Sequence, residues 1–312
     1  MGTFLHHVVL AAPLFVLVFV GYGLMHWGQW PQTVSQALSR FVFSVALPAL
    51  LFHLMSDMSK LPPVDARLLI AFFGACLIVF AIGRLVAARF FRLDGVSQSV
   101  FALGGVFSNN VLLGVPLAKV ALGDAALPSV ALVLVFNALT LWTLVTVSIE
   151  WARHGSFSAA GFAKTAKGVA TNPVVAAIVL GSLFGLTGLT MPALVQTPLA
   201  MLAQAAAPMA LVALGMGLAE FDVRTGWRQS VAICGLKLVV QPLAVWALAR
   251  LLGLPPMETK VVVLLGSIAV GANVYLMSRQ FKVMEGPVAA SLVLSTALAS
   301  VTTPLVLTLL GG

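Results

Sequence analysis

The feature that most constrains this chain is a series of apolar stretches, each about as long as a helix that crosses a lipid bilayer. About 20 apolar residues span the hydrocarbon core when they are helical. Ten such stretches lie near residues 4–25, 33–55, 66–89, 97–120, 127–150, 168–187, 192–219, 227–252, 258–281 and 286–309. Only 8% of the residues are charged, against about a quarter in soluble domains. The sequence therefore predicts an all-α polytopic membrane protein with ten transmembrane helices in the lipid bilayer.

The basic residues indicate orientation in the membrane and not nucleic-acid binding, because they lie in short loops. The loops after the odd-numbered stretches, with the adjoining helix ends, hold eleven: Arg40, Arg84, Arg89, Arg92, Arg153, Lys164, Lys167, Arg224, Arg228, Arg279 and Lys282. The other side holds five: Lys60, Arg67, Lys119, Arg250 and Lys260. Cytoplasmic loops are enriched in Lys and Arg. We therefore predict that the odd loops are cytoplasmic and that both termini lie outside.

The fourth stretch contains the segment GGVFSNNVLLGVP at residues 104–116, which combines two amides, three glycines and a proline. Asn109 and Asn110 are costly in hydrocarbon unless they are hydrogen-bonded. Pro116 lacks an N–H and its ring clashes with the carbonyl of Leu112. Irregular backbone at this depth occurs only where it is buried in protein or lines a cavity. The segment predicts a broken helix; the alternative is a proline kink whose amides bond a neighbouring helix.

Ten stretches divide into two sets of five, and an odd number in each half requires that an internal repeat be inverted in the membrane. Landmarks recur at nearly one offset: Pro48 and Pro208 are 160 residues apart, and Arg89 and Arg250, like Asp124 and Glu285, are 161 residues apart. We therefore predict a single membrane domain that consists of a first repeat at 1–155 and an inverted repeat at 156–312.

This register pairs the fourth stretch with the ninth, which contains Gly271 and Asn273 in SIAVGANVYLM. In secondary transporters, corresponding interrupted helices of the two halves meet at the substrate site. The pairing favours a functional break over a kink.

The motif NNVLLGVPL, with Asn109, Gly114 and Pro116, resembles the auxin efflux carrier family, as do LPALLF at 47–52 and GANVYLM at 271–277. The resemblance extends over essentially the whole chain. It implies two inverted five-helix repeats with broken, crossing helices four and nine, an architecture related to the bile-acid symporters. It also implies elevator-type alternating access, and its bacterial members include carriers of malonate and other organic acids.

Two departures from the family refine this expectation. Only about 17 residues, 151–167, join the fifth and sixth stretches, which favours the bacterial branch and an inner-membrane location and argues against auxin as the substrate. Ala269 and Val270 stand where relatives often have a proline before the ninth-stretch asparagine. We therefore expect the second crossover to be less sharply unwound than the first.

The candidate substrate-binding residues are Asn109, Asn110, Gly114, Pro116, Gly271, Asn273 and Tyr275. We hypothesise that Asn109 and Asn273 donate to a substrate carboxylate, helped by N–H groups freed after breaks at 112–114 and 274–276. Asn110, about 100° around a regular helix from Asn109, is then a packing residue. The supporting or coupling candidates are Pro48, His53, Asn137, Pro208, Lys237 and Gln241.

Two of these candidates have open alternatives. Lys237 lies near the middle of its stretch, where a lysine costs roughly 2.5–3.5 kcal/mol. It is either a counter-charge for an anion, a structural cation that replaces sodium, or a donor to free carbonyls near Pro242. His53 is a candidate for proton coupling because histidine is the side chain suited to that role in proteins, whereas its ordinary role would be a hydrogen bond between helices.

The sequence predicts a secondary carrier of small organic anions, such as malonate, with a proton or sodium as a candidate coupling ion and a homodimer as a candidate assembly. Paired intramembrane carboxylates, metal-ligand clusters, nucleophile motifs and phosphate loops are missing from the sequence, which argues against an enzyme. We expect no catalytic residue, metal or cofactor. The alternatives are a sodium-coupled carrier similar to bile-acid symporters, an anion channel and a membrane-embedded enzyme.

Overall fold

The computed structural model describes residues 2–56, 64–154, 171, 173–221 and 226–311. Lys60, Lys164, Lys167 and Arg224 of the predicted loops, and most of the 151–167 connection, lie outside these residues. The α-helices are α1 (Gly2–His26), α2 (Gln32–Phe41), α3 (Leu47–Ser56), α4 (Arg67–Phe91), α5 (Gly95–Val106), α6 (Val115–Leu122), α7 (Leu127–His154), α9 (Pro173–Leu186), α10 (Ala193–Leu218), α11 (Trp227–Gly235), α12 (Gln241–Leu251), α13 (Pro256–Ser267), α14 (Ala272–Phe281) and α15 (Glu285–Gly311). The described residues contain no β-strand, only one isolated β-bridge.

Six helices in the described residues are long and apolar enough to cross a membrane: Gln32–Ser56, Arg67–Phe91, Asp124–Arg153, Ala193–Leu218, Trp227–Leu251 and Glu285–Gly311. Shorter apolar helices cover Ala11–His26, Gly95–Val106, Asn110–Leu122 and Pro173–Leu186. The prediction of an all-helical membrane protein is confirmed. The count of ten spans stays a prediction, because the predicted fourth and ninth spans are each divided into pieces too short to cross a membrane alone.

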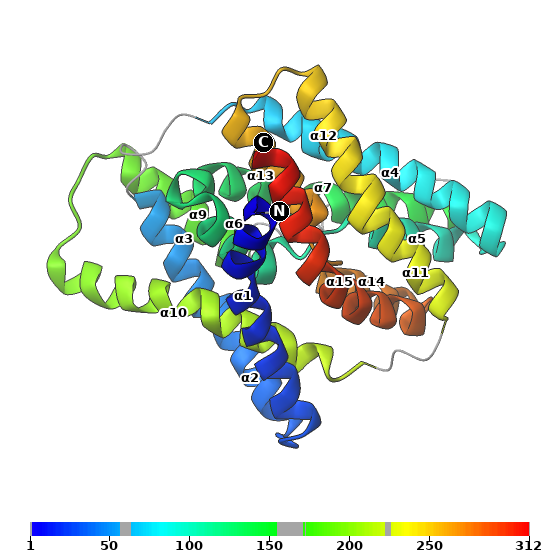
Figure 1. The fold of residues 1–312 in the computed structure, drawn as a ribbon, viewed down its shortest axis with the longest axis horizontal. Coiled ribbons are helices and arrows are strands. Elements are labelled where there is room, and N and C mark those ends of the chain that lie inside the picture. The colour runs from blue at the N-terminus through cyan, green and yellow to red at the C-terminus, as the bar shows by residue number, and fades with distance from the viewer. Residues whose placement is uncertain (1, 57–63, 155–170, 172, 222–225, 312) are drawn as a thin grey trace.

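The helices form two groups that meet where α1 packs on α15 (Figure 1). The smaller helix group contains α1, α2, α3, α9 and α10, and the larger helix group contains α4, α5, α7 and α11 to α15. The segment η3 (Asn110–Gly114) and α6 contact α1 and α10 of the smaller group as well as α7 and α13 of the larger group. The fourth predicted span therefore lies where the two groups meet.

Glycine permits the tightest packing in the smaller helix group. A Cβ atom on Gly21 of α1 would overlap the carbonyl oxygen of Val212 in α10, and one on Gly215 would overlap that of Val18. Small residues let membrane helices approach this closely because lipid provides no hydrophobic force between helices, and packing must hold them together. The α1–α10 contact therefore depends on these two glycines.

Three π-helical segments interrupt the described helices, and each is followed after one residue by a proline. They are η1 (Val42–Ala46) before Pro48, η3 before Pro116, and η5 (Leu236–Val240) before Pro242. A proline ring clashes with the carbonyl four residues earlier, and in all three cases that carbonyl belongs to the π-helical segment. The wider turn accommodates the ring without ending the helix. Pro116 therefore does not produce the break that the sequence predicts at 112–114.

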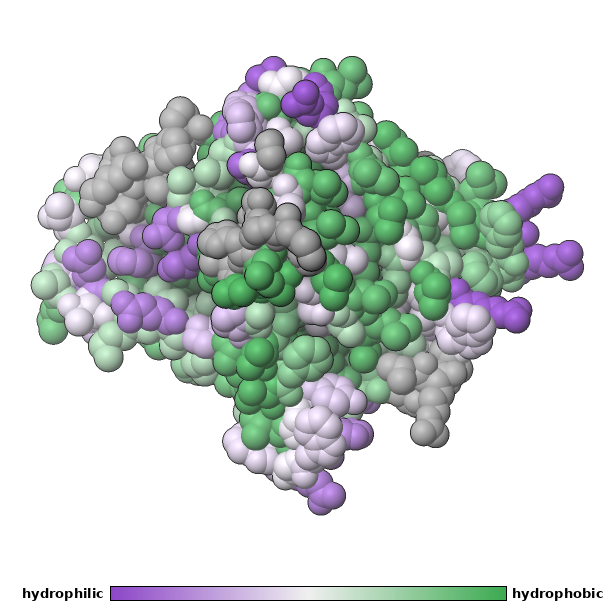
Figure 2. All heavy atoms as spheres, in the orientation of Figure 1, coloured by the Kyte–Doolittle hydropathy of each residue, from purple (hydrophilic) through white to green (hydrophobic). Residues whose placement is uncertain are grey.

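Apolar residues cover much of the face in Figure 2, and strongly hydrophilic residues gather mostly toward its margins. Large apolar side chains are exposed on helices of both groups, among them Leu85, Leu183, Leu194 and Leu309. A soluble monomer rarely exposes so much contiguous apolar surface, whereas lipid solvates it without cost.

Candidate functional site

Two irregular segments cross at the centre of the candidate site. Residues 107–109 separate α5 from η3, and residues 268–271 separate α13 from α14. The segments pair antiparallel: the N–H of Asn109 donates to the carbonyl of Ala269 at 2.9 Å, and the N–H of Gly271 donates to that of Phe107 at 2.8 Å. Ser108 and Val270 form the bridge between these two bonds. The first break thus includes Asn109 and the second ends before Asn273, so the predicted breaks at 112–114 and 274–276 are each several residues too late.

Side chains satisfy other backbone groups that the second break leaves without helical partners. The hydroxyl of Ser295 in α15 accepts from the N–H of Val270 at 3.0 Å. Nζ of Lys237 donates to the carbonyl of Gly266 in the last turn of α13. Lys237 is fully buried, and a cation at a helix C-terminus is stabilised by the helix dipole. Of the three alternatives for Lys237, donation to a free carbonyl is the contact observed.

The two adjacent asparagines have different surroundings. Asn109 is 6% exposed, and its Nδ2 has no hydrogen-bond partner in the described part of the chain. Nδ2 of Asn110 donates to Oδ1 of Asn137 in α7 at 3.4 Å, although its own Oδ1 is unpaired. The neighbouring hydroxyl of Ser108 is also buried without a partner. Buried polar groups are nearly always paired, so Ser108 and Asn109 are unusual at this crossing.

Glycines allow the two broken segments to approach each other. A Cβ on Gly271 would lie 2.9 Å from the carbonyl oxygen of Ser108 and 3.0 Å from Cδ1 of Phe107. A Cβ on Gly114 would lie 2.9 Å from Cδ2 of Leu265. A side chain at position 271 would therefore collide with backbone, whereas one at position 114 would require the flexible end of Leu265 to shift.

Asn273 and Tyr275 lie in the first turn of α14, and both are partly buried. In the paired segments Asn109 lies opposite Ala269 and not opposite Asn273. Asn273 lies in α14, which packs against α5. The Tyr275 ring meets that of Phe221 edge to face, with centroids 4.6 Å apart, and the Arg279 guanidinium lies 6.0 Å from its centroid. The structure thus brings the two segments together and holds Tyr275 in an aromatic contact.

The remaining candidates form no hydrogen bond to the paired segments among the described residues. Nε2 of Gln241 donates to Sγ of Cys76 in α4 at 3.2 Å, and its Oε1 is unpaired. His53 is partly buried in α3, where its carbonyl accepts from the Ser56 hydroxyl at 2.8 Å. Pro48 is partly buried in the first turn of α3, and Pro208 is exposed in α10.

Two serines at the crossing were missed by sequence reasoning. Ser108 is visible as the residue before the asparagine pair, but a serine in an apolar helix usually bonds its own backbone. Ser295 is one of several hydroxyl residues in α15, and nothing in the sequence marks it as the partner of Val270. Among the described residues, no group of three or more His, Cys, Asp or Glu side chains is placed to hold a metal ion.

Comparison with known proteins identifies the class of molecule that contains this crossing. The family described as membrane transport protein matches residues 6–307 of the chain, which is almost its full length. This chain belongs to that family. The match confirms the resemblance to the auxin efflux carrier family. A relative from Rhizobium meliloti (strain 1021), named "Putative malonate transporter", is 28% identical over 296 residues, covering 94% of this chain and 92% of the relative. As a member of the membrane transport protein family, the chain is a transporter and not an enzyme.

Proposed function

We propose that this transporter is a secondary carrier of small carboxylates, such as malonate, and that the substrate binds at the crossing of residues 107–109 and 268–271. The observation that carries the proposal is the Nδ2 of Asn109, a buried donor that has no partner among the described residues, and the preceding Ser108 has a buried hydroxyl that also has none. A buried donor left without a partner costs about 1–3 kcal/mol. A carboxylate oxygen that accepts from Nδ2 of Asn109 would remove this cost.

The charge at the crossing favours an anion. Both η3 and α14 begin there, and helix N-termini attract negative charge. Glu258 is the only carboxylate among the buried polar side chains of the described residues. It lies in the first turn of α13, about 12 Å along that helix from Gly266, and its Oε1 accepts from the N–H of Asp65 at 3.4 Å. Among the described residues, an organic cation would find no buried carboxylate at the crossing, and the name of the R. meliloti relative supports a dicarboxylate.

Alternating access would arise from movement of the larger helix group against the smaller one. Contacts in the smaller group support the inverted repeat: α1 packs on α10 and α3 packs on α9. The first contact joins the first and seventh predicted spans, and the second joins the second and sixth. An inverted repeat relates the first span to the sixth and the second to the seventh, so it converts one of these contacts into the other. We propose ten spans on this basis, with both termini outside the inner membrane.

Transport in proteoliposomes tests the proposal. Purified protein should take up labelled malonate with saturation. It should also exchange external labelled malonate for internal unlabelled malonate, because the substrate site of a carrier can cross the membrane in both directions with substrate bound. Asn109→Ala should reduce uptake at low substrate concentration, and Lys119→Ala, at a surface site, should not. A malonate current that does not saturate as the malonate concentration rises would indicate a channel. Saturable transport of organic cations but not of malonate would reject the anionic substrate.

A further inference from the structure

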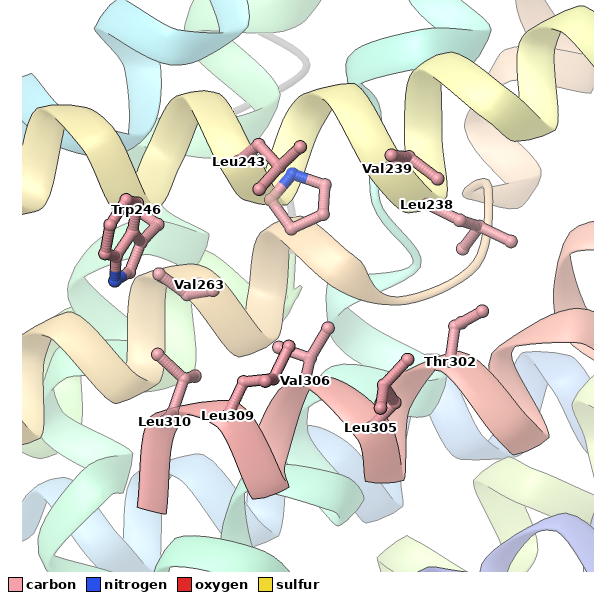
Figure 3. Close-up of a pocket in the computed structure, with 11 residues that line it drawn as sticks. Leu238, Val239, Leu243, Trp246, Val263, Thr302, Leu305, Val306, Leu309 and Leu310 are labelled. Carbon is pink, nitrogen blue, oxygen red and sulfur yellow. The ribbon is translucent and has the colours of Figure 1, made fainter. Parts of the chain in front are cut away.

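An apolar groove separate from the crossing lies between α12 and α15, over α13 (Figure 3). Its cavity volume is about 450 Å³. Val239, Leu243 and Trp246 line one side, Leu305 and Leu309 line the other, and Val263 lies between them. Thr302, at the end opposite Trp246, is the only polar side chain in the lining.

The groove is long enough to hold most of a lipid chain from one leaflet. Val239 and Trp246, and likewise Thr302 and Leu309, are seven residues apart, which corresponds to about 10 Å of helix. Half of the hydrocarbon core is about 15 Å thick. An acyl chain of one leaflet would therefore fill the groove and extend slightly beyond it.

Basic residues stand at the end of the groove where Trp246 lies. Arg250 is one turn past Trp246 on the same face of α12, and Lys260 is one turn before Val263 on the same face of α13. Neither side chain has a hydrogen-bond or ion-pair partner among the described residues. Arg67 also reaches this end, where it donates to the carbonyl of Leu252, but its guanidinium is paired with Asp65.

We propose that the groove binds an anionic phospholipid, with one acyl chain between α12 and α15 and the phosphate between Arg250 and Lys260. Tryptophan prefers the boundary between hydrocarbon and headgroups, and Trp246 lies between the groove and Arg250. Basic pockets between membrane helices bind anionic headgroups in this way. Arg250 and Lys260 lie on the membrane side predicted to carry only five basic residues. The enrichment of Lys and Arg in cytoplasmic loops therefore does not explain them.

Native mass spectrometry of the purified full-length chain in mild detergent tests the site, with phosphatidylglycerol and phosphatidylcholine of identical acyl chains as probes. Wild type should retain phosphatidylglycerol preferentially. A basic residue near an anionic surface is worth about fivefold in binding, so the double variant Arg250→Gln/Lys260→Gln should bind phosphatidylglycerol about 25-fold more weakly. Its binding of phosphatidylcholine should not change. Arg89→Gln, which removes an exposed charge from the end of α4, is the matched control and should behave as wild type.

A second pair of variants tests the acyl chain. Leu305→Trp fills the groove and should reduce retention of both lipids, whereas Val301→Trp, on the same helix but outside the lining, should not. Leu309→Trp replaces Leu305→Trp if the latter does not fold. Wild-type lipid binding in a groove-filling variant, or undiminished phosphatidylglycerol binding in the double variant, would overturn the proposal. A dimer that is lost only on filling the groove would show that a second copy covers it instead.

Discussion

The N–H of Gly271 donates to the carbonyl of Phe107, which joins two segments that are 164 residues apart in the sequence. The bond is possible because Gly271 has no side chain: a Cβ would lie 2.9 Å from the carbonyl oxygen of Ser108. Backbone atoms of Ser108 cannot move aside without breaking the pairing. The identity of residue 271 therefore determines how closely the two broken helices approach.

Gly271→Ala should lower the unfolding temperature and abolish malonate transport, since overpacking of this kind costs about 1–3 kcal/mol. The matched control is Gly235→Ala at the end of α11, where a Cβ meets nothing within 4 Å and the backbone is helical. That change should be neutral or stabilising by up to about 1 kcal/mol. Thermal unfolding in detergent and flux in proteoliposomes measure both effects. Equal behaviour of the two variants would mean that the close approach at Gly271 is unimportant.

Lys237→Met should reduce flux and unfolding temperature together, because the carbonyl of Gly266 loses its donor at a cost of about 1–3 kcal/mol. Lys237→Arg, which retains the charge, should preserve part of the flux. Lys119→Met removes a lysine that is 39% exposed and only loosely paired with Asp124, and it should change neither quantity. If Lys237 instead faces the substrate, the methionine variant will lose malonate affinity while its unfolding temperature is unchanged.

The sequence predicted the membrane class, the family and the two interrupted stretches, because composition and glycine–asparagine motifs are local signals. It placed the interruptions several residues too late. Asn109 and Gly271 mark the breaks through hydrogen bonds to Ala269 and Phe107, and such bonds between distant segments leave no local pattern. The first break lies at 107–109, where these bonds form. Pro116 does not break the helix, because the π-helical turn before it accommodates the proline ring.

Side-chain partners were the least predictable part of the site. An intramembrane lysine signals that a partner is needed, but the sequence does not show that Lys237 would meet a helix C-terminus instead of a substrate. In the same way, adjacent asparagines look alike in the sequence, and only the position of Asn137 distinguishes the paired Asn110 from Asn109. The count of ten spans and the inverted repeat remain predictions.

Asp94 provides a pH-dependent contribution at the start of α5. Its carboxylate accepts from the Ser97 hydroxyl and from the N–H groups of Val96 and Ser97. These bonds, the Ser97 hydroxyl first, lower the pKa of Asp94 below 3.8. Because the folded pKa is the lower one, the stabilisation is complete above about pH 4 and is lost as pH falls through the folded value. Asp94→Ala should cost about 1 kcal/mol at neutral pH, and the difference from wild type should shrink in unfolding scans below pH 4.

The direction of that difference tests the N-cap assignment. The control variant is Asp124→Ala. Asp124 is exposed, and the N-cap of its short helix is Gly123, which has no side-chain hydrogen bond. It should match wild type at neutral pH. A deficit of Asp94→Ala that grows as the pH falls would contradict a carboxylate cap.

The central claim is that the unpaired amide of Asn109 binds the substrate carboxylate, and isothermal titration of malonate into purified variants measures it most directly. A hydrogen bond to a charged group is worth about 1.5–3 kcal/mol, so Asn109→Ala should bind malonate about 10- to 150-fold more weakly, and Asn273→Ala should do so by the same hypothesis. Asn109→Asp should be weaker still, since it opposes like charges. Asn110→Ala, which removes the donor to Asn137, should lose thermal stability and retain affinity. Wild-type affinity in Asn109→Ala together with a large loss in Asn110→Ala would contradict the account and move the site to Asn110.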